Sequence, residues 1–113
     1  MKYLLIILLI LLLFFVLHGQ EETIEISWDK YNSSPDAEFI YIYEIDENQG
    51  IIEKLGTVSI QDTIFRFNLI PQNKIYYFVI TAIDTAGNES EFSNIVSCDY
   101  EKPVAPQHLE IKK

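Results

Sequence analysis

The chain has 113 residues, which is enough for one domain and too few for two. It carries 17 acidic and 8 basic side chains, a formal net charge of −9. This charge argues against nucleic acid or an anionic membrane surface as a partner, because both would repel the chain. A single cysteine excludes an internal disulfide. The many aromatic and β-branched residues favour sheet over helix.

The N-terminal residues form an apolar run, residues 3–17, behind a positive charge at Lys2. At about 1.5 Å per residue the run makes roughly 22 Å of helix, shorter than the ~30 Å hydrocarbon core of a bilayer. With the small residue Gly19 behind it, this pattern predicts that residues 1–19 are a cleaved signal peptide. The alternative is an uncleaved N-terminal membrane anchor, which would touch the membrane through residues 3–17 alone. Either interpretation predicts an exported protein, periplasmic, secreted or on the cell surface.

Residues 23–30 alternate between apolar and polar side chains, as a half-buried strand does. Ile24, Ile26 and Trp28 share one face. Because Trp28 is in phase with the two isoleucines, we expect it to pack in a core rather than form an aromatic surface site.

Residues 37–46 are the next expected strand, and alternation alone would bury Phe39, Tyr41, Tyr43 and Ile45. On this pattern Glu44 and Asp46 point outward, but the facing of this strand stays ambiguous.

Two more strands are expected before the centre of the chain. A hairpin turn over residues 47–50 leads into a short strand, residues 51–58, with a bulge or kink at Gly56. Residues 62–69 alternate again, with Phe65, Phe67 and Leu69 on the inner face.

Residues 75–94 read as a long strand, a tight polar loop and the start of another strand. Tyr76, Phe78, Ile80 and Ala82 make one apolar row of the long strand. In the loop, Gly87 or Asn88 can adopt a positive φ at little cost. Val96 and Cys98 are expected to alternate inward in the closing strand, where a lone cysteine is usually an inert small hydrophobe.

The stretch from Leu69-x-Pro71 through this strand and loop resembles the E–F corner, F strand, F–G loop and G strand of a fibronectin type III domain. The resemblance implies an all-β, immunoglobulin-like sandwich over residues 20–100. It also implies a tyrosine corner, in which the hydroxyl of Tyr76 bonds back to the connecting backbone. Because an extra residue lies between Pro71 and Tyr76, Tyr77 is the alternative candidate for the tyrosine of this corner. The expected core residues are Trp28, Phe65, Phe67, Leu69, Pro71, Tyr76, Phe78 and Ile80.

The same resemblance favours turning Ile40 and Ile42 inward, which leaves tyrosines on the outer face of the sheet. Rigid aromatic side chains give contact area at low entropic cost, so this face and the polar loop are the candidate binding surface. The candidate residues are Tyr41, Tyr43, Tyr77, Asn88 and Glu89. The competing interpretation is that the tyrosines are ordinary strand formers on a solvated sheet.

Residues 101–113 resemble the linker and A strand that begin a following repeat, while no A strand precedes Trp28. Three interpretations stay open for this tail. It is a disordered or extended remnant, or it folds back beside the strand of Trp28, or residues 103–113 add to the open edge of another copy and make a homo-oligomer.

The sequence shows no catalytic or metal-binding pattern, and neither His18 nor His108 has a partner at metal-ligand spacing. We therefore expect no enzyme, no cofactor and no metal site. The predicted function is an exported, non-catalytic protein-interaction or adhesion module with an unknown protein or glycan partner. Alternatives are a structural subunit that assembles by donating its C-terminal strand, and an accessory module of a glycan-degrading system.

Overall fold

The computed structural model describes Tyr3, Ile6, Ile7, Leu9 and residues 20–113. The expected export segment, residues 1–19, lies for the most part outside these residues. No helix in the described part of the chain is both long enough and apolar enough to cross a membrane.

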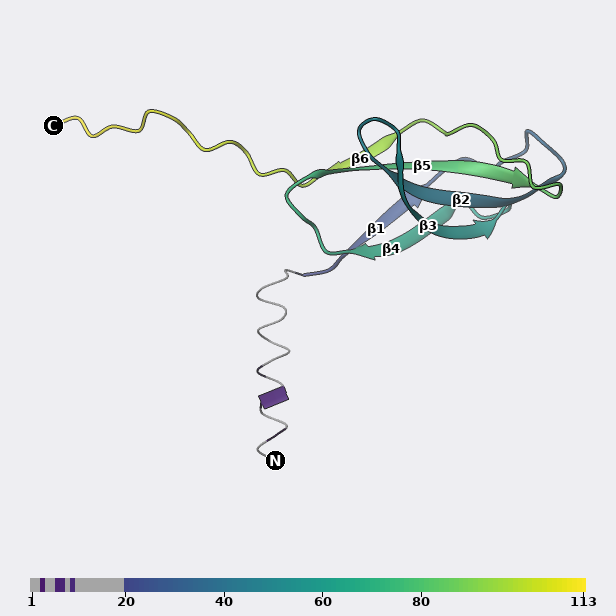
Figure 1. Cartoon of the computed structure of the whole chain (residues 1–113), viewed down its shortest axis with the longest axis horizontal. Helices are drawn as coiled ribbons and strands as arrows, with labels where there is room; N and C mark the ends of the chain where they lie inside the picture. Colours follow the sequence, from purple (N-terminus) through teal and green to yellow (C-terminus); the bar gives the residue numbers. More distant parts are fainter. Residues whose placement is uncertain (1–2, 4–5, 8, 10–19) are drawn as a thin grey trace.

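Six strands make up the body of the molecule, and the expectation of an all-β architecture is confirmed (Figure 1). They form two antiparallel sheets, one of order β1-β4 and one of order β3-β2-β5-β6, consistent with a β-sandwich. The strands are β1 (Glu22–Ser27), β2 (Ala37–Ile45), β3 (Ile51–Ser59), β4 (Ile64–Leu69), β5 (Ile75–Asp84) and β6 (Val96–Asp99).

The centre of the larger sheet is the pair β2 and β5, and its register settles which face of β2 is inside. Ile40 lies opposite Ala82, and Ile42 lies opposite Ile80. Since successive side chains of a strand point to opposite faces, these four share the inner face. Ile40 and Ile42 are 2% and 0% exposed. Phe39, which alternation alone would have buried, is 39% exposed instead.

Aromatic side chains join the two sheets. The ring of Phe67 on β4 meets that of Phe78 on β5 edge to face, with 5.3 Å between centroids. The ring of Phe65 on β4 occupies the space above Gly56 on β3, where a Cβ atom would lie only 2.5 Å from it. The predicted irregularity of β3 is present at this place, because the register with β2 skips Leu55. The edge formed by β3 and β4 is therefore closed by direct packing.

A hydrogen bond between a side chain and the backbone fixes the entry into β5. The backbone N–H of Gln72 donates to the hydroxyl of Tyr76 over 3.0 Å, so Tyr76 rather than Tyr77 bonds back to the connecting backbone. The ring of Tyr76 is 4% exposed. It stacks on Phe78 and meets Tyr100 edge to face, at centroid distances of 6.5 and 5.8 Å.

The expected core differs in degree of burial from the observed one. Tyr76 and Phe78 are buried, but the other expected core residues are only half-buried: Trp28, Phe65, Phe67, Leu69, Pro71 and Ile80. Phe65, Phe67 and Leu69 on β4 face inward with the predicted alternation, and Ile80 on β5 lies opposite Ile42 on the inner face. Trp28 follows the end of β1 and Pro71 follows the end of β4, so strand alternation does not place these two residues. Ile80 stays partly exposed because the two-stranded sheet does not cover the whole inner face of the four-stranded sheet.

The close approach of Phe65 to Gly56 generates a prediction about stability. Gly56→Ala should lower the free energy of unfolding by about 1–3 kcal/mol, because the added methyl group overpacks this contact. Urea denaturation measures the change. In a double-mutant cycle, Phe65→Leu should recover part of the loss, and strictly additive effects of the two substitutions would show that the contact is not the cause.

Candidate binding face

The outer face of the four-stranded sheet carries an apolar cluster of its own. Its floor is Tyr43, Ile45 and Val79, which are 7%, 1% and 1% exposed. Three half-buried aromatic rings pack against this floor. We call the whole set the outer aromatic cluster: Tyr41, Tyr43, Ile45, Tyr77, Val79 and Phe92.

The pairing of β2 with β5 brings this cluster together. Tyr41 lies opposite Thr81, Tyr43 opposite Val79, and Ile45 opposite Tyr77. The alternate residues of both strands therefore share the face that points away from β1 and β4. Phe92 comes from the segment between β5 and β6, and its ring lies 6.3 Å from that of Tyr43, centroid to centroid.

Tyr43 is held in place by a polar contact at the edge of the cluster. Its hydroxyl donates to the carboxylate of Glu89, whose two oxygens lie at 3.1 and 3.0 Å. The Oγ1 of Thr81 donates to the same carboxylate over 3.1 Å. Burial and, after it, the hydrogen bond to anionic Glu89 raise the pKa of Tyr43 to about 12. Tyr43 and Glu89 thus tie the loop before β6 to the sheet.

Tyr41 is partly covered by a cation. The Nζ of Lys54 on β3 lies 3.2 Å from the centroid of the Tyr41 ring, a cation–π contact. The edge of the Tyr41 ring meets Tyr43, with 6.3 Å between centroids. The surface of the cluster that stays accessible is therefore made by parts of Tyr41, Tyr77 and Phe92.

The predicted tight loop at the end of β5 is organised by Asp84. Its carboxylate accepts the backbone N–H groups of Ala86 and Asn88, at 3.0 and 2.8 Å, and the side-chain amide of Asn88 at 3.1 Å. These hydrogen bonds, above all those from Asn88, lower the pKa of Asp84. Gly87, and not Asn88, takes the positive φ, at 86°.

The five residues of the expected binding surface differ in their exposure and in their hydrogen bonds. Tyr41 and Tyr77 are half-buried and present part of their rings at the surface of the cluster. Tyr43 differs from that expectation, because it lies beneath the other rings and bonds to Glu89. Asn88 is exposed, and its side-chain amide is bonded to Asp84 within the turn. Of the loop between β5 and β6, Glu89 is therefore the expected residue that contacts the cluster directly.

The binding surface expected from the sequence did not include three members of the cluster, namely Phe92, Ile45 and Val79. The apolar residues on both faces of residues 40–45 were the available signal for Ile45, since a strand buried on both sides has such a run. For Phe92 the sequence held no comparable signal, because it lies outside any strand.

The side chains of the outer aromatic cluster are aromatic or aliphatic, and the carboxylate of Glu89 beside them already accepts two hydroxyl donors. Within residues 20–113 and the four described N-terminal residues, no three His, Cys, Asp or Glu side chains gather closely enough to hold a metal ion.

The Tyr43 hydroxyl generates a prediction with a defined pH range. Tyr43→Phe should lower the free energy of unfolding at neutral pH by about 1 kcal/mol, because the partly buried hydrogen bond to Glu89 is lost. The raised pKa stabilises the folded state below the ordinary tyrosine pKa of 10, and this contribution is lost as pH rises towards about 12. The difference between wild type and variant should therefore shrink over that range.

Chemical denaturation at several pH values measures this difference, and Tyr41→Phe is the matched control. A difference that stays constant from neutral pH to pH about 12 would show that the hydroxyl of Tyr43 does not carry the effect.

Asp84 generates a second pH prediction, of opposite sign. Its pKa is lowered in the folded state, so ionised Asp84 stabilises the protein above its ordinary pKa of 3.8, and this contribution is lost as pH falls through the lower folded pKa. Asp84→Asn should be less stable than wild type at neutral pH, with the gap closing in acid. Thermal denaturation as a function of pH measures the gap, with Asp62→Asn as control; a gap independent of pH would contradict the assignment.

No protein-family model matches the chain, and no curated protein matches it.

Proposed function

We propose that this chain is an exported, non-catalytic protein-interaction module of fibronectin type III type, and that the outer aromatic cluster is its contact surface. The fold part of the proposal is supported by the sheet orders β1-β4 and β3-β2-β5-β6 and by the bond from Gln72 to the Tyr76 hydroxyl. The export part rests on the apolar run of residues 3–17.

The observation that carries the proposed function is the construction of the outer face. A sheet face that only meets solvent needs no buried floor, yet here Ile45 and Val79 are each 1% exposed beneath aromatic rings. The rings of Tyr41 and Tyr77 are held by packing on this floor, and the Glu89 loop borders them. Protein contact surfaces favour such an arrangement, in which rigid aromatic groups stand in a packed setting with a polar margin.

The charge of the chain adds a constraint on the partner. With a net charge of −9, the protein is steered towards neutral or basic protein surfaces and away from acidic ones. Lys54 over Tyr41 is a cation within the face itself, which gives an acidic or amide group of a partner a local donor.

The proposal predicts that the face can be disabled without loss of the fold. Tyr41→Ser/Tyr77→Ser removes two half-buried rings and leaves the buried floor in place. Wild type and variant, purified from cells that express the full chain, serve as baits for secreted and cell-surface proteins of the host. Recovery of bound partners should fall about tenfold or more with the variant, because losing central aromatic contacts typically costs ~2 kcal/mol or more.

The matched control is Ile64→Ser, which removes a 42% exposed apolar side chain from the outer face of the other sheet. It should bind as wild type does. Equal recovery with wild type and the double variant, with both shown to be folded by circular dichroism, would contradict the proposed surface.

A further inference from the structure

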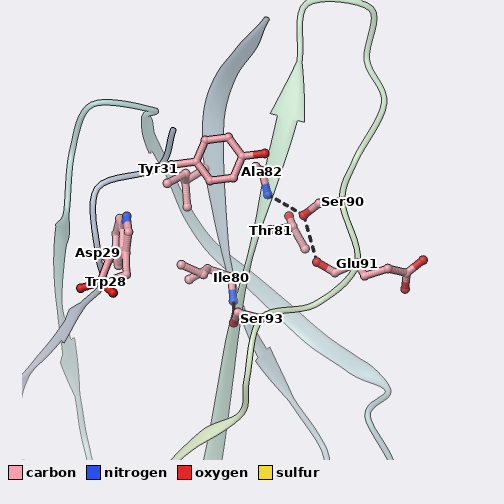
Figure 2. A pocket seen from close by; sticks show the side chains of 10 residues that line it. Trp28, Asp29, Tyr31, Ile80, Thr81, Ala82, Ser90, Glu91 and Ser93 are labelled. Atoms are coloured by element: carbon pink, nitrogen blue, oxygen red, sulfur yellow. Dashed lines mark hydrogen bonds between the residues drawn. The ribbon is translucent and has the colours of Figure 1, made fainter. Parts of the chain in front are cut away.

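On one side of the sandwich a space is left between the end of β1 with the residues that follow it and the segment that leads into β6. A pocket of about 220 Å³ opens there and is lined by Trp28 and Tyr31 on one side and Ser90 and Ser93 on the other (Figure 2). A neighbouring pocket of about 280 Å³ continues past Trp28 and Ser93 to Val96. We call the two together the seam groove. On the opposite side of the sandwich Phe65 closes the corresponding space above Gly56.

Two serines hold the groove open. Ser90 accepts the backbone N–H of Ala82 with its hydroxyl and donates its own N–H to the carbonyl of Ala82, at 2.9 and 2.8 Å. Ser93 makes the same pair of bonds with Ile80, at 3.0 and 2.9 Å. The edge of β5 is thereby satisfied without a regular strand, so β6 begins only at Val96. The inner face beside Trp28 and Ile80 stays partly uncovered.

The strand that borders the groove has a free edge. In the described part of the chain β1 pairs with β4 alone, so its other edge offers unpaired backbone N–H and C=O groups. An open strand edge beside partly exposed apolar side chains accepts a further strand.

The C-terminal tail has the properties of such a strand. Beyond Tyr100 it runs away from the sandwich with no regular secondary structure (Figure 1). Leu109 and Ile111 are 96% and 87% exposed and stand two residues apart, with Glu110 between them. Its prolines, Pro103 and Pro106, both precede this segment, so every residue from 107 to 113 keeps its backbone N–H.

We propose that residues 109–113 of one copy add to the free edge of β1 in a second copy, with Leu109 entering the seam groove at Trp28 and Ile111 facing the same inner side beside Ile26. This assembly surface is separate from the outer aromatic cluster, and the inference does not depend on the proposed function.

The direction of the tail favours a second copy over the same chain. The tail leaves the domain beside the start of β1, where the Tyr100 hydroxyl bonds to Glu22 and the Lys102 N–H bonds to Asn73. A tail folding back from that point would run parallel to β1. Every pairing within the two sheets is antiparallel, and an antiparallel strand must enter from the Trp28 end, which a second copy can supply.

Charge selects one register among those that turn the two apolar tail residues inward. With Leu109 opposite Trp28 and Ile111 opposite Ile26, Lys112 comes opposite Glu25. A shift by two residues in either direction places Glu110 opposite Glu25 or Asp29, which like-charge repulsion disfavours. Glu25 already pairs with Arg66 at 2.7 Å on its other side, so Lys112 would complete a row of alternating charges.

The first test is the mass of the assembly in solution. Protein purified from cells expressing the full chain should show at least twice the monomer mass by light scattering. Leu109→Ser/Ile111→Ser should reduce it to the monomer mass. Val104→Ser is the matched control, since Val104 is equally exposed, at 88%, in the same tail but outside the paired segment; it should leave the assembly unchanged. A monomeric wild type, or an assembly that the double variant leaves unchanged, overturns the proposal.

The second test traps the register in a Cys98→Ser background. Ser27→Cys in one chain and Glu110→Cys in another become directly opposite, within disulfide reach. When the two variants are mixed in a thiol redox buffer, the disulfide between them should form in excess over that between Thr23→Cys and Glu110→Cys. Equal yields of the two pairs overturn the register. If one chain bearing both Ser27→Cys and Glu110→Cys forms the disulfide within itself and stays monomeric, the tail folds back and the proposal fails.

Discussion

The register between β2 and β5 is the constraint on which both faces of the larger sheet depend. Ile42 stands opposite Ile80, and this one alignment puts the isoleucines of β2 in the sandwich and its tyrosines outside. A slip by one residue would exchange the two faces and carry the hydroxyl of Tyr43 into the core. On the outer face the hydroxyl of Tyr43 has a hydrogen-bond partner in the carboxylate of Glu89.

The unequal size of the two sheets explains much of the remaining geometry. Four strands present more inner surface than two can cover, so one side closes through Phe65 above Gly56 and the other stays open at Trp28. Ser90 and Ser93 satisfy the edge of β5 with their own hydroxyls and backbone groups, which delays β6 and keeps the seam groove from closing. The groove and the shortness of β6 therefore have a common cause.

The outer aromatic cluster and the free edge of β1 offer different kinds of contact. The outer aromatic cluster is a side-chain surface, in which the packed floor of Ile45 and Val79 holds half-exposed rings in place. The free edge of β1 is a backbone surface, whose unpaired groups accept any strand of suitable direction and pattern. The proposed partner contact and the proposed self-assembly are compatible, because the outer aromatic cluster lies on the outer face of the four-stranded sheet and the free edge of β1 belongs to the two-stranded sheet.

The sequence by itself determined the strands that are buried on one side. Alternation placed β1 and β4 and the inward phase of Phe65 and Phe67, because a half-buried strand has a period of two that can be recognised without its neighbours. Only the tertiary structure decided the facing of β2, which is apolar on both sides, and the burial of Tyr43 beneath Phe92. These depend on contacts between segments far apart in the chain, so no local pattern of residues encodes them.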